Sequence, residues 1–274
     1  MIDVQNTPDT RDIPLTKVGV KGLLYPVTVL DKVKKVQHTT ARADLFADLP
    51  RHFKGTHMSR FVEIFHRHRQ DLSMPRFLEM LEEIISSLEA ESAWGVLEFP
   101  YFLEKNAPVS RLPGIVSYIC RYQGRVDRPN TANTKTSTAG LKIGRHFTVS
   151  VAVPVTTVCP CSKAISDRGA HNQRGIVTVE VELGPFFWIE DIIEIVEKAA
   201  SSPVYSILKR EDEKQITEAA YDNPQFVEDL VRDVYIEVRK LGAFPRFSVE
   251  AENFESIHNH SAFARAEYSE STNL

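Results

Sequence analysis

Soft metal ligands lie close together at one point of the 274-residue sequence. Cys159 and Cys161 are separated by a single proline, and His171 follows within the same short region. Thiols beside an imidazole are typical of a metal site or of thiol chemistry. The β-branched run 147–158 precedes them, so we expect a strand that ends at Cys159. Strand ends hold reactive groups rigidly and leave them accessible to a ligand.

Four groups that are distant in the sequence are candidates for one metal site: Cys159, His171, Glu213 and His258. A closed structural zinc site typically takes its ligands from two close pairs. A mixed set of thiolate, imidazole and carboxylate therefore suits a catalytic ion with an open coordination position. Such an ion would acidify a bound water or polarise an electrophile.

Each of these candidates also has a purely structural interpretation. Cys159 would be a packed thiol at a strand end, and His171 a loop residue that caps backbone carbonyls. Glu213 lies in the charged run 210–214, which is typical of a solvated surface. Cys161 would either take part in the chemistry or only pack.

Two histidines near the C-terminal end, His258 and His260, alternate in an extended segment. Alternate residues of an extended chain project to opposite sides. One histidine would then be functional and the other structural or exposed.

Several side chains are candidates for binding a substrate. A polyphosphate would need several basic donors, because the chain has no glycine-rich nucleotide loop of the Walker or dinucleotide type. The basic candidates are Lys163 and Arg174 in the second half of the chain and Lys54, His57 and Arg60 in the first. Lys54 and Arg60 would otherwise be solvated residues at a helix start. Glu228 could accept two N–H hydrogen bonds from a guanine-like ring edge, although its periodicity places it on the polar face of a helix.

The composition limits the classes of protein to which the chain can belong. Hydrophobic residues make up 42% and charged residues 26%, which is typical of a globular protein in water. No apolar run approaches the roughly 20 residues of a membrane helix, and the net charge of −4 gives no footprint for nucleic-acid binding. Three cysteines indicate reduced thiols, and the first residues lack the features of a secretory signal, so we expect a cytoplasmic location.

Hydrophobic periodicity predicts an α+β fold that repeats one order of elements. In the first half we expect strands 17–30, 36–46, 95–103 and 114–123 and helices 58–69 and 74–90. In the second half we expect strands 141–158, 175–183 and 244–251 and helices 189–200 and 224–241. The repeated order calls for one more strand there, whose bounds beyond His258 the sequence leaves open. The polar stretch 128–140 is predicted to be a linker or mobile loop between a first domain, 1–127, and a second, 141–274. Joining the edges of such half-sheets around a ring would form an oligomeric barrel.

The motifs at 3–5, 54–61, 156–163, 169–174 and 255–260 together resemble the GTP cyclohydrolase IB family. The resemblance implies a tandem tunnelling fold and a homotetramer. It implies conversion of GTP and water to 7,8-dihydroneopterin triphosphate and formate, the first step towards tetrahydrofolate. It also implies a divalent metal ion, with zinc, manganese and iron all conceivable.

The resemblance also suggests roles for individual residues. It implies that Cys159 is the catalytic thiolate ligand, that His171, Glu213 and His258 fill the other metal or acid–base roles, and that Glu228 anchors the guanine. Metal-activated water would then attack C8 of the guanine and open the imidazole ring, and a second hydrolysis would expel formate. His258 or His171 would move protons, because an imidazole titrates near neutral pH.

Two other functions fit parts of the sequence. One is a nitrile reductase of the queuosine pathway, in which a cysteine attacks a nitrile and a nicotinamide supplies hydride. That enzyme would have no use for a set of metal ligands. The other is a noncatalytic metal-binding or interaction protein whose cysteines sense the redox state.

Overall fold

The computed structural model describes residues 8–129 and 143–270. The described elements are β1 (Leu15–Asp31), β2 (Lys35–Leu49), α1 (Met58–His68), α2 (Met74–Leu88), β3 (Ser92–Asn106), β4 (Pro113–Asp127), β5 (Gly144–Val158), α3 (Pro160–Ile165), β6 (Asn172–Glu182), α4 (Ile189–Ala199), β7 (Ser202–Pro203), α5 (Arg210–Asp222), α6 (Val227–Leu241), β8 (Arg246–Asn253) and β9 (Ala262–Ser269). Hydrogen bonds link the strands in the order β1-β2-β3-β4-β5-β6-β8-β9, with β7 beside β5. The pairs β1–β2, β2–β3, β6–β8 and β8–β9 are antiparallel. The predicted α+β class is confirmed.

The chain divides into two compact units. The first comprises the described residues up to Phe99 together with Arg121–Thr148, and the second comprises Pro100–Cys120 together with the described residues from Val149 onwards. β3, β4 and β5 therefore contribute residues to both units. This division follows spatial contacts rather than the order of elements, so the sequence domains 1–127 and 141–274 stay a prediction. Residues 130–140 of the predicted linker lie outside the described residues.

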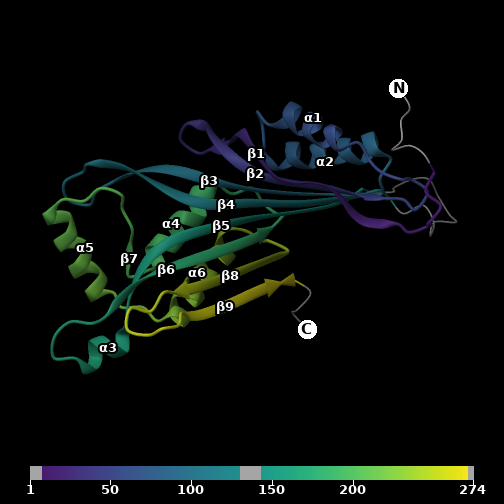
Figure 1. The fold of residues 1–274 in the computed structure, drawn as a ribbon. Coiled ribbons are helices and arrows are strands. Elements are labelled where there is room, and N and C mark those ends of the chain that lie inside the picture. The colour runs from purple at the N-terminus through teal and green to yellow at the C-terminus, as the bar shows by residue number, and fades with distance from the viewer. Residues whose placement is uncertain (1–7, 130–142, 271–274) are drawn as a thin grey trace. The chain divides into compact units, whose positions relative to one another are not determined.

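The core of the first unit is apolar and aromatic. Its helices α1 and α2 lie side by side and pack against β1 and β2 (Figure 1). The predicted stripe of α2 is buried, and Phe77 makes edge-on contacts with Tyr122 and Phe147, with ring centroids 6.4 and 5.6 Å apart. Gly124 lies beneath this ring, because a Cβ there would lie 2.6 Å from Phe77. Ser73 occupies the N-cap position of α2, but its side chain makes no capping hydrogen bond.

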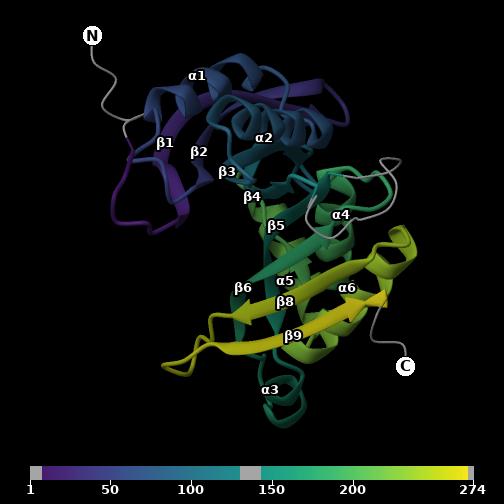
Figure 2. The same ribbon diagram turned by 90° about the vertical axis from the view of Figure 1, so that its right-hand side faces the viewer.

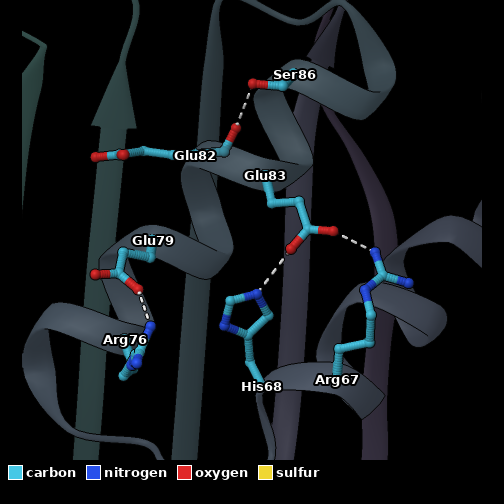
Figure 3. Close-up of polar contacts among 7 residues, drawn as sticks. All are labelled: Arg67, His68, Arg76, Glu79, Glu82, Glu83 and Ser86. Atoms are coloured by element: carbon cyan, nitrogen blue, oxygen red, sulfur yellow. Dashed lines mark hydrogen bonds and ion pairs between the residues drawn. The ribbon is translucent and has the colours of Figure 1, made fainter.

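The outer faces of α1 and α2 are joined by ionic contacts (Figure 3). Glu83 of α2 forms an ion pair with Arg67 and lies 2.7 Å from His68 Nε2, and both of these partners belong to α1. Partial burial alone would raise the pKa of Glu83, but the hydrogen bonds and charges of His68 and Arg67 together outweigh it, so this pKa is lowered. These polar contacts are at the surface, since the Glu83 side chain is 38% exposed.

The second unit contains β6, β8 and β9 in front of α4 and α6 (Figure 2). The buried residues of α6 fall at helical spacing and face these strands: Val227, Leu230, Val231, Val234 and Val238. Every second residue of β6 is buried, and the register of this strand with β8 pairs Gly175 with Asn253 and Val181 with Phe247. Hydrophobic periodicity therefore predicted α4, α6, β6 and β8 correctly to within a few residues.

Three described elements of the second unit, α3, β7 and α5, were not predicted as regular structure. The six residues of α3 include no buried residue, and α5 buries only Asp212 and Ala220. Neither helix has an apolar stripe, which is the feature that sequence periodicity detects. Strand β9 is the last strand of the repeated order, whose bounds the sequence left open, and it pairs with β8 along its whole length. No helix in the described ranges is long and apolar enough to cross a membrane.

Candidate functional site

Cys159 and His171 are held together by the loop that contains α3. Cys159 is the last residue before α3, where β5 has ended, and its backbone N–H donates to the carbonyl of His171 at 3.1 Å. Ser162 donates its N–H to Cys159 Sγ at 3.4 Å and accepts a hydrogen bond from the His171 N–H through its hydroxyl oxygen at 3.1 Å. These hydrogen bonds hold the backbones of Cys159 and His171 in fixed positions relative to each other.

The His171 ring is held by polar side chains of the strands. Its Nδ1 lies 2.9 Å from Gln173 Oε1 and 3.8 Å from Glu255 Oε2. Gln173 in turn donates from Nε2 to Thr157 Oγ1 at 2.8 Å. Thr157 is fully buried and Gln173 is 6% exposed. With Nδ1 occupied, the ring presents Nε2 to a ligand.

Three of these residues have roles that the sequence analysis did not assign. Thr157 and Gln173 are polar residues at inward positions of alternating strands, and a polar residue at such a position is a signal that could have been used. Glu255 lies just beyond the end of β8, and the motif 255–260 that it begins gave it no role of its own. Its proximity to His171 depends on the pairing of β6 with β8.

The predicted phosphate-binding residues beside this loop differ in their surroundings. Lys163 donates from Nζ to the carbonyl of Tyr221 and lies 4.3 Å from the centroid of that ring, so it connects α3 to the last turn of α5. Arg174 has an exposed side chain, and its carbonyl accepts from the Phe254 N–H at 2.9 Å. Cys161 is exposed on α3.

His258 lies in the connection between β8 and β9, which is at the same end of this unit as α3 (Figures 1 and 2). Its ring is exposed and stacks on that of His260, with centroids 5.1 Å apart and an interplanar angle of 16°. The expectation that the two rings project to opposite sides was wrong, because this segment bends and the alternation rule applies only to extended chain.

Glu213 is exposed on the first turn of α5. It lies about two helical turns before Tyr221, which corresponds to about 12 Å along the axis. In the described ranges of this single chain, no three or more His, Cys, Asp or Glu side chains are grouped as metal ligands. Backbone hydrogen bonding thus links Cys159 to His171 within one chain, whereas Glu213 and His258 do not join them in a group of metal ligands.

The neighbour of Glu213 explains how the start of α5 is fixed. Asp212 is fully buried and accepts hydrogen bonds from the N–H groups of Val109, Ser110 and Lys209 and from the Ser110 hydroxyl, at 2.6 to 2.9 Å. Burial opposes ionisation, but these hydrogen bonds outweigh it and hold the pKa of Asp212 well below its usual range. The carboxylate thus anchors the helix that carries Glu213.

The predicted guanine-binding residue is close to the same strand end. The Gln225 N–H donates to the carbonyl of Val158, which immediately precedes Cys159. Glu228 is exposed three residues further along, on the first turn of α6. Together with the exposed ring of Phe226 it lines an open cavity of about 330 Å³ that also includes Asp229 and Arg232.

The remaining basic candidates belong to the other compact unit. Lys54 is exposed, and Arg60 donates from Nη1 to the carbonyl of Ser87 at 2.8 Å. His57 and Arg60 line a cavity of about 110 Å³ with Thr56.

Cys120 is buried, and burial raises the pKa of its thiol, so it packs rather than reacts.

The family model that matches this chain and two proteins similar to it carry the same description. A family model described as type I GTP cyclohydrolase FolE2 matches residues 1–264. A GTP cyclohydrolase FolE2 of Syntrophus aciditrophicus is 52% identical over 97% of this chain and 99% of its own length. That of Syntrophotalea carbinolica is 49% identical over 98% of this chain and 95% of its own. Among solved structures, urate oxidase of Bacillus subtilis 168 superposes with a TM-score of 0.48 at 8% identity, over 93% of this chain and 99% of that chain.

Proposed function

Because the chain belongs to the type I GTP cyclohydrolase FolE2 family, we propose that it converts GTP and water to 7,8-dihydroneopterin triphosphate and formate at the Cys159 loop. The observation that carries the location is the loop in which Ser162 bonds both Cys159 and His171. Family membership favours this reaction over the nitrile reductase and the noncatalytic metal-binding protein. The narrower IB designation, suggested by the sequence motifs, is part of the proposal.

The donor chemistry of the loop fits a divalent metal ion. A cysteine thiolate and an imidazole Nε2 suit zinc, manganese or iron to different degrees. Cys159 and His171 would supply two ligands, and Glu213 and His258 are the proposed others. When bound, such an ion would provide an electrophile that polarises water or a purine ring atom.

Assembly of several copies would bring in donors that one chain does not group together. Among the described strands, β1 and β9 are the terminal strands of the hydrogen-bonded order. Open strand edges pair readily with another chain. We therefore keep the homotetramer, built as a tunnelling-fold barrel, as part of the proposal, with a cytoplasmic location.

The substrate would be held by residues on either side of the loop. Glu228 would accept the N–H groups of the guanine edge, and the nearby ring of Phe226 offers a stacking surface. Lys163 and Arg174 are the proposed triphosphate donors beside the loop, and Lys54, His57 and Arg60 are those of the other unit. Either His258 or His171 is the group proposed to move protons.

Replacing Cys159 with alanine tests this function. We expect the variant to lose both stoichiometric metal and turnover. Among the described cysteines, Cys159 is the one whose backbone is hydrogen-bonded to His171. Metal content would be measured by elemental analysis and turnover by pterin fluorescence after oxidation, anaerobically, with zinc, manganese, iron and magnesium in turn. Cys161→Ala is the matched control and should keep both properties. Full turnover with stoichiometric metal in Cys159→Ala would refute the assignment.

A further inference from the structure

The side chain of Gln173 has a role that metal ligation alone does not assign. It lies on β6 between Thr157 and His171 and is 6% exposed. Both ends of its amide are engaged, Oε1 with His171 Nδ1 at 2.9 Å and Nε2 with Thr157 Oγ1 at 2.8 Å. We propose that Gln173 is a positioning residue that fixes His171 in the tautomer with a proton on Nδ1, so that Nε2 presents its lone pair to the metal. The part of this proposal that concerns the metal rests on the proposed function.

The hydrogen-bonding capacity of an amide determines the tautomer. A carbonyl oxygen can only accept, so its partner Nδ1 must carry the proton and donate it. In a neutral imidazole the other nitrogen, Nε2, then has the lone pair. If the amide were turned round, its NH₂ group would face Nδ1, which would have to accept. The proton would then sit on Nε2 and block that atom as a ligand.

Thr157 holds the other end of the amide. Its hydroxyl oxygen accepts from Gln173 Nε2, and the residue is fully buried at the end of β5. In the orientation seen here both ends of the buried amide have a hydrogen-bond partner, and loss of the Thr157 oxygen would leave the NH₂ group without one, which is costly. The relay therefore runs from Thr157 through Gln173 to His171.

Other groups near the ring do not set its tautomer. Glu255 Oε2 lies 3.8 Å from Nδ1, which is too long for a hydrogen bond. Ser162 bonds the backbone N–H of His171 rather than its ring. Gln173 is thus the described residue that makes a hydrogen bond to the imidazole at Nδ1.

The first test reads the tautomer without metal. In ¹⁵N-labelled apo protein, the histidine nitrogen shifts distinguish an Nδ1–H ring from an Nε2–H ring, and His171→Ala identifies the signal. We expect the Nδ1–H form in the native chain. A dominant Nε2–H form would overturn the inference while leaving the proposed GTP cyclohydrolase activity untouched.

The second test measures the affinity for Co²⁺, using competition with a chromophoric chelator and the cobalt–thiolate absorption. Gln173→Leu removes the acceptor, and loss of such an outer partner typically weakens metal binding by about 10- to 100-fold. Gln173→Glu keeps an acceptor for Nδ1 and should restore the affinity to within a few-fold of the native chain. Ser248→Ala removes a comparable buried polar side chain on β8 and should leave the affinity unchanged.

A third variant covers the case in which Gln173→Leu does not fold. Thr157→Val preserves the shape of the side chain but removes the acceptor for the amide, which can then turn. We expect an increased Nε2–H population and weaker Co²⁺ binding. Native Co²⁺ affinity in a folded Gln173→Leu or Thr157→Val variant would refute the relay, whereas native metal and turnover in Cys159→Ala would refute the function itself.

Discussion

The two halves of the chain have the same basic order of elements but differ in what has been added to it. The first half runs β1, β2, α1, α2, β3 and β4, and the second runs β5, β6, α4, α6, β8 and β9 with α3, β7 and α5 inserted. The inserted α3 follows directly after Cys159 and carries Lys163, and α5 carries Glu213. The common elements thus supply a scaffold, and the additions in the second half carry two of the candidate site residues and adjoin Cys159.

The two compact units also differ in what they bury. Buried polar residues of the first unit, within the described ranges, are Thr28, Asp31 and Thr56. Those of the second unit are Thr157, Gln173, Ser201, Ser202, Asp212, Ser248 and Asn253. Buried polar groups destabilise a fold unless they are hydrogen-bonded, so they are retained where they position something. The second unit also holds the ion pair of Lys105 and Glu197, 2.7 Å apart, where burial lowers the pKa of the lysine.

The largest effect on stability should come from the apolar core of the first unit. Phe77 is fully buried among Tyr122, Phe147 and Leu81, and replacing it with alanine removes a whole ring from this cluster. We expect a loss of about 4 kcal/mol in the free energy of unfolding, since comparable truncations cost about 3–5 kcal/mol. Urea unfolding would measure it.

The Co²⁺ affinity of folded Phe77→Ala provides the contrast with the second unit. It should equal that of the native chain, because none of the loop contacts involves Phe77. A variant with native stability, or one that stays folded but loses Co²⁺ affinity, would show that the division of roles between the units is wrong.

The acid sensitivity of the second unit should depend in part on Asp212. Its pKa is lowered from the ordinary 3.8, so its contribution to stability is complete above that pH and is lost as the pH falls through the folded-state pKa. Asp212→Asn should be less stable than the native chain at pH 7, with α5 opening locally before global unfolding. The effect should be smaller than that of Phe77→Ala.

Two measurements check the Asp212 prediction. Urea midpoints at pH 7, 5 and 3 should show the difference between the native chain and Asp212→Asn shrinking at the lowest pH. Hydrogen exchange should locate the loss of protection in α5. A difference that stays constant down to pH 3 would show that the carboxylate charge does not anchor this helix.

Sequence reasoning succeeded where structure depends on local periodicity. The stripes of α2 and α6 and the alternation in β6 each bury one face, so their patterns predicted the elements. Helix α5 was missed because one buried carboxylate, rather than an apolar face, attaches it to the rest of the unit. Such an attachment leaves no periodic signal.

Sequence reasoning found the part of the candidate site that is local in the chain and missed the part that depends on strand pairing. Cys159 and His171 are close in sequence, and the loop brings them together. The position of Gln173 between Thr157 and His171 depends on neighbouring strands, and that of Glu255 depends on the end of β8. Long-range pairing of this kind is invisible to a local pattern. The same holds for Glu213 and His258, whose proposed convergence with the loop would require contacts beyond those of the described chain.

The smallest effect should come from the surface polar contacts of the first unit. Glu83 pairs with Arg67 and His68 across α1 and α2, but its side chain is 38% exposed, so solvent and salt screen the interaction (Figure 3). Glu83→Gln should cost no more than about 1 kcal/mol, and raising the ionic strength should reduce that cost. Glu79→Gln, which breaks a more exposed pair with Arg76 on α2, is the matched control and should cost less. If urea unfolding gave Glu83→Gln a loss near that of Phe77→Ala, independent of salt, then polar contacts would stabilise the first unit as strongly as its aromatic core, and the contrast between the units would not hold.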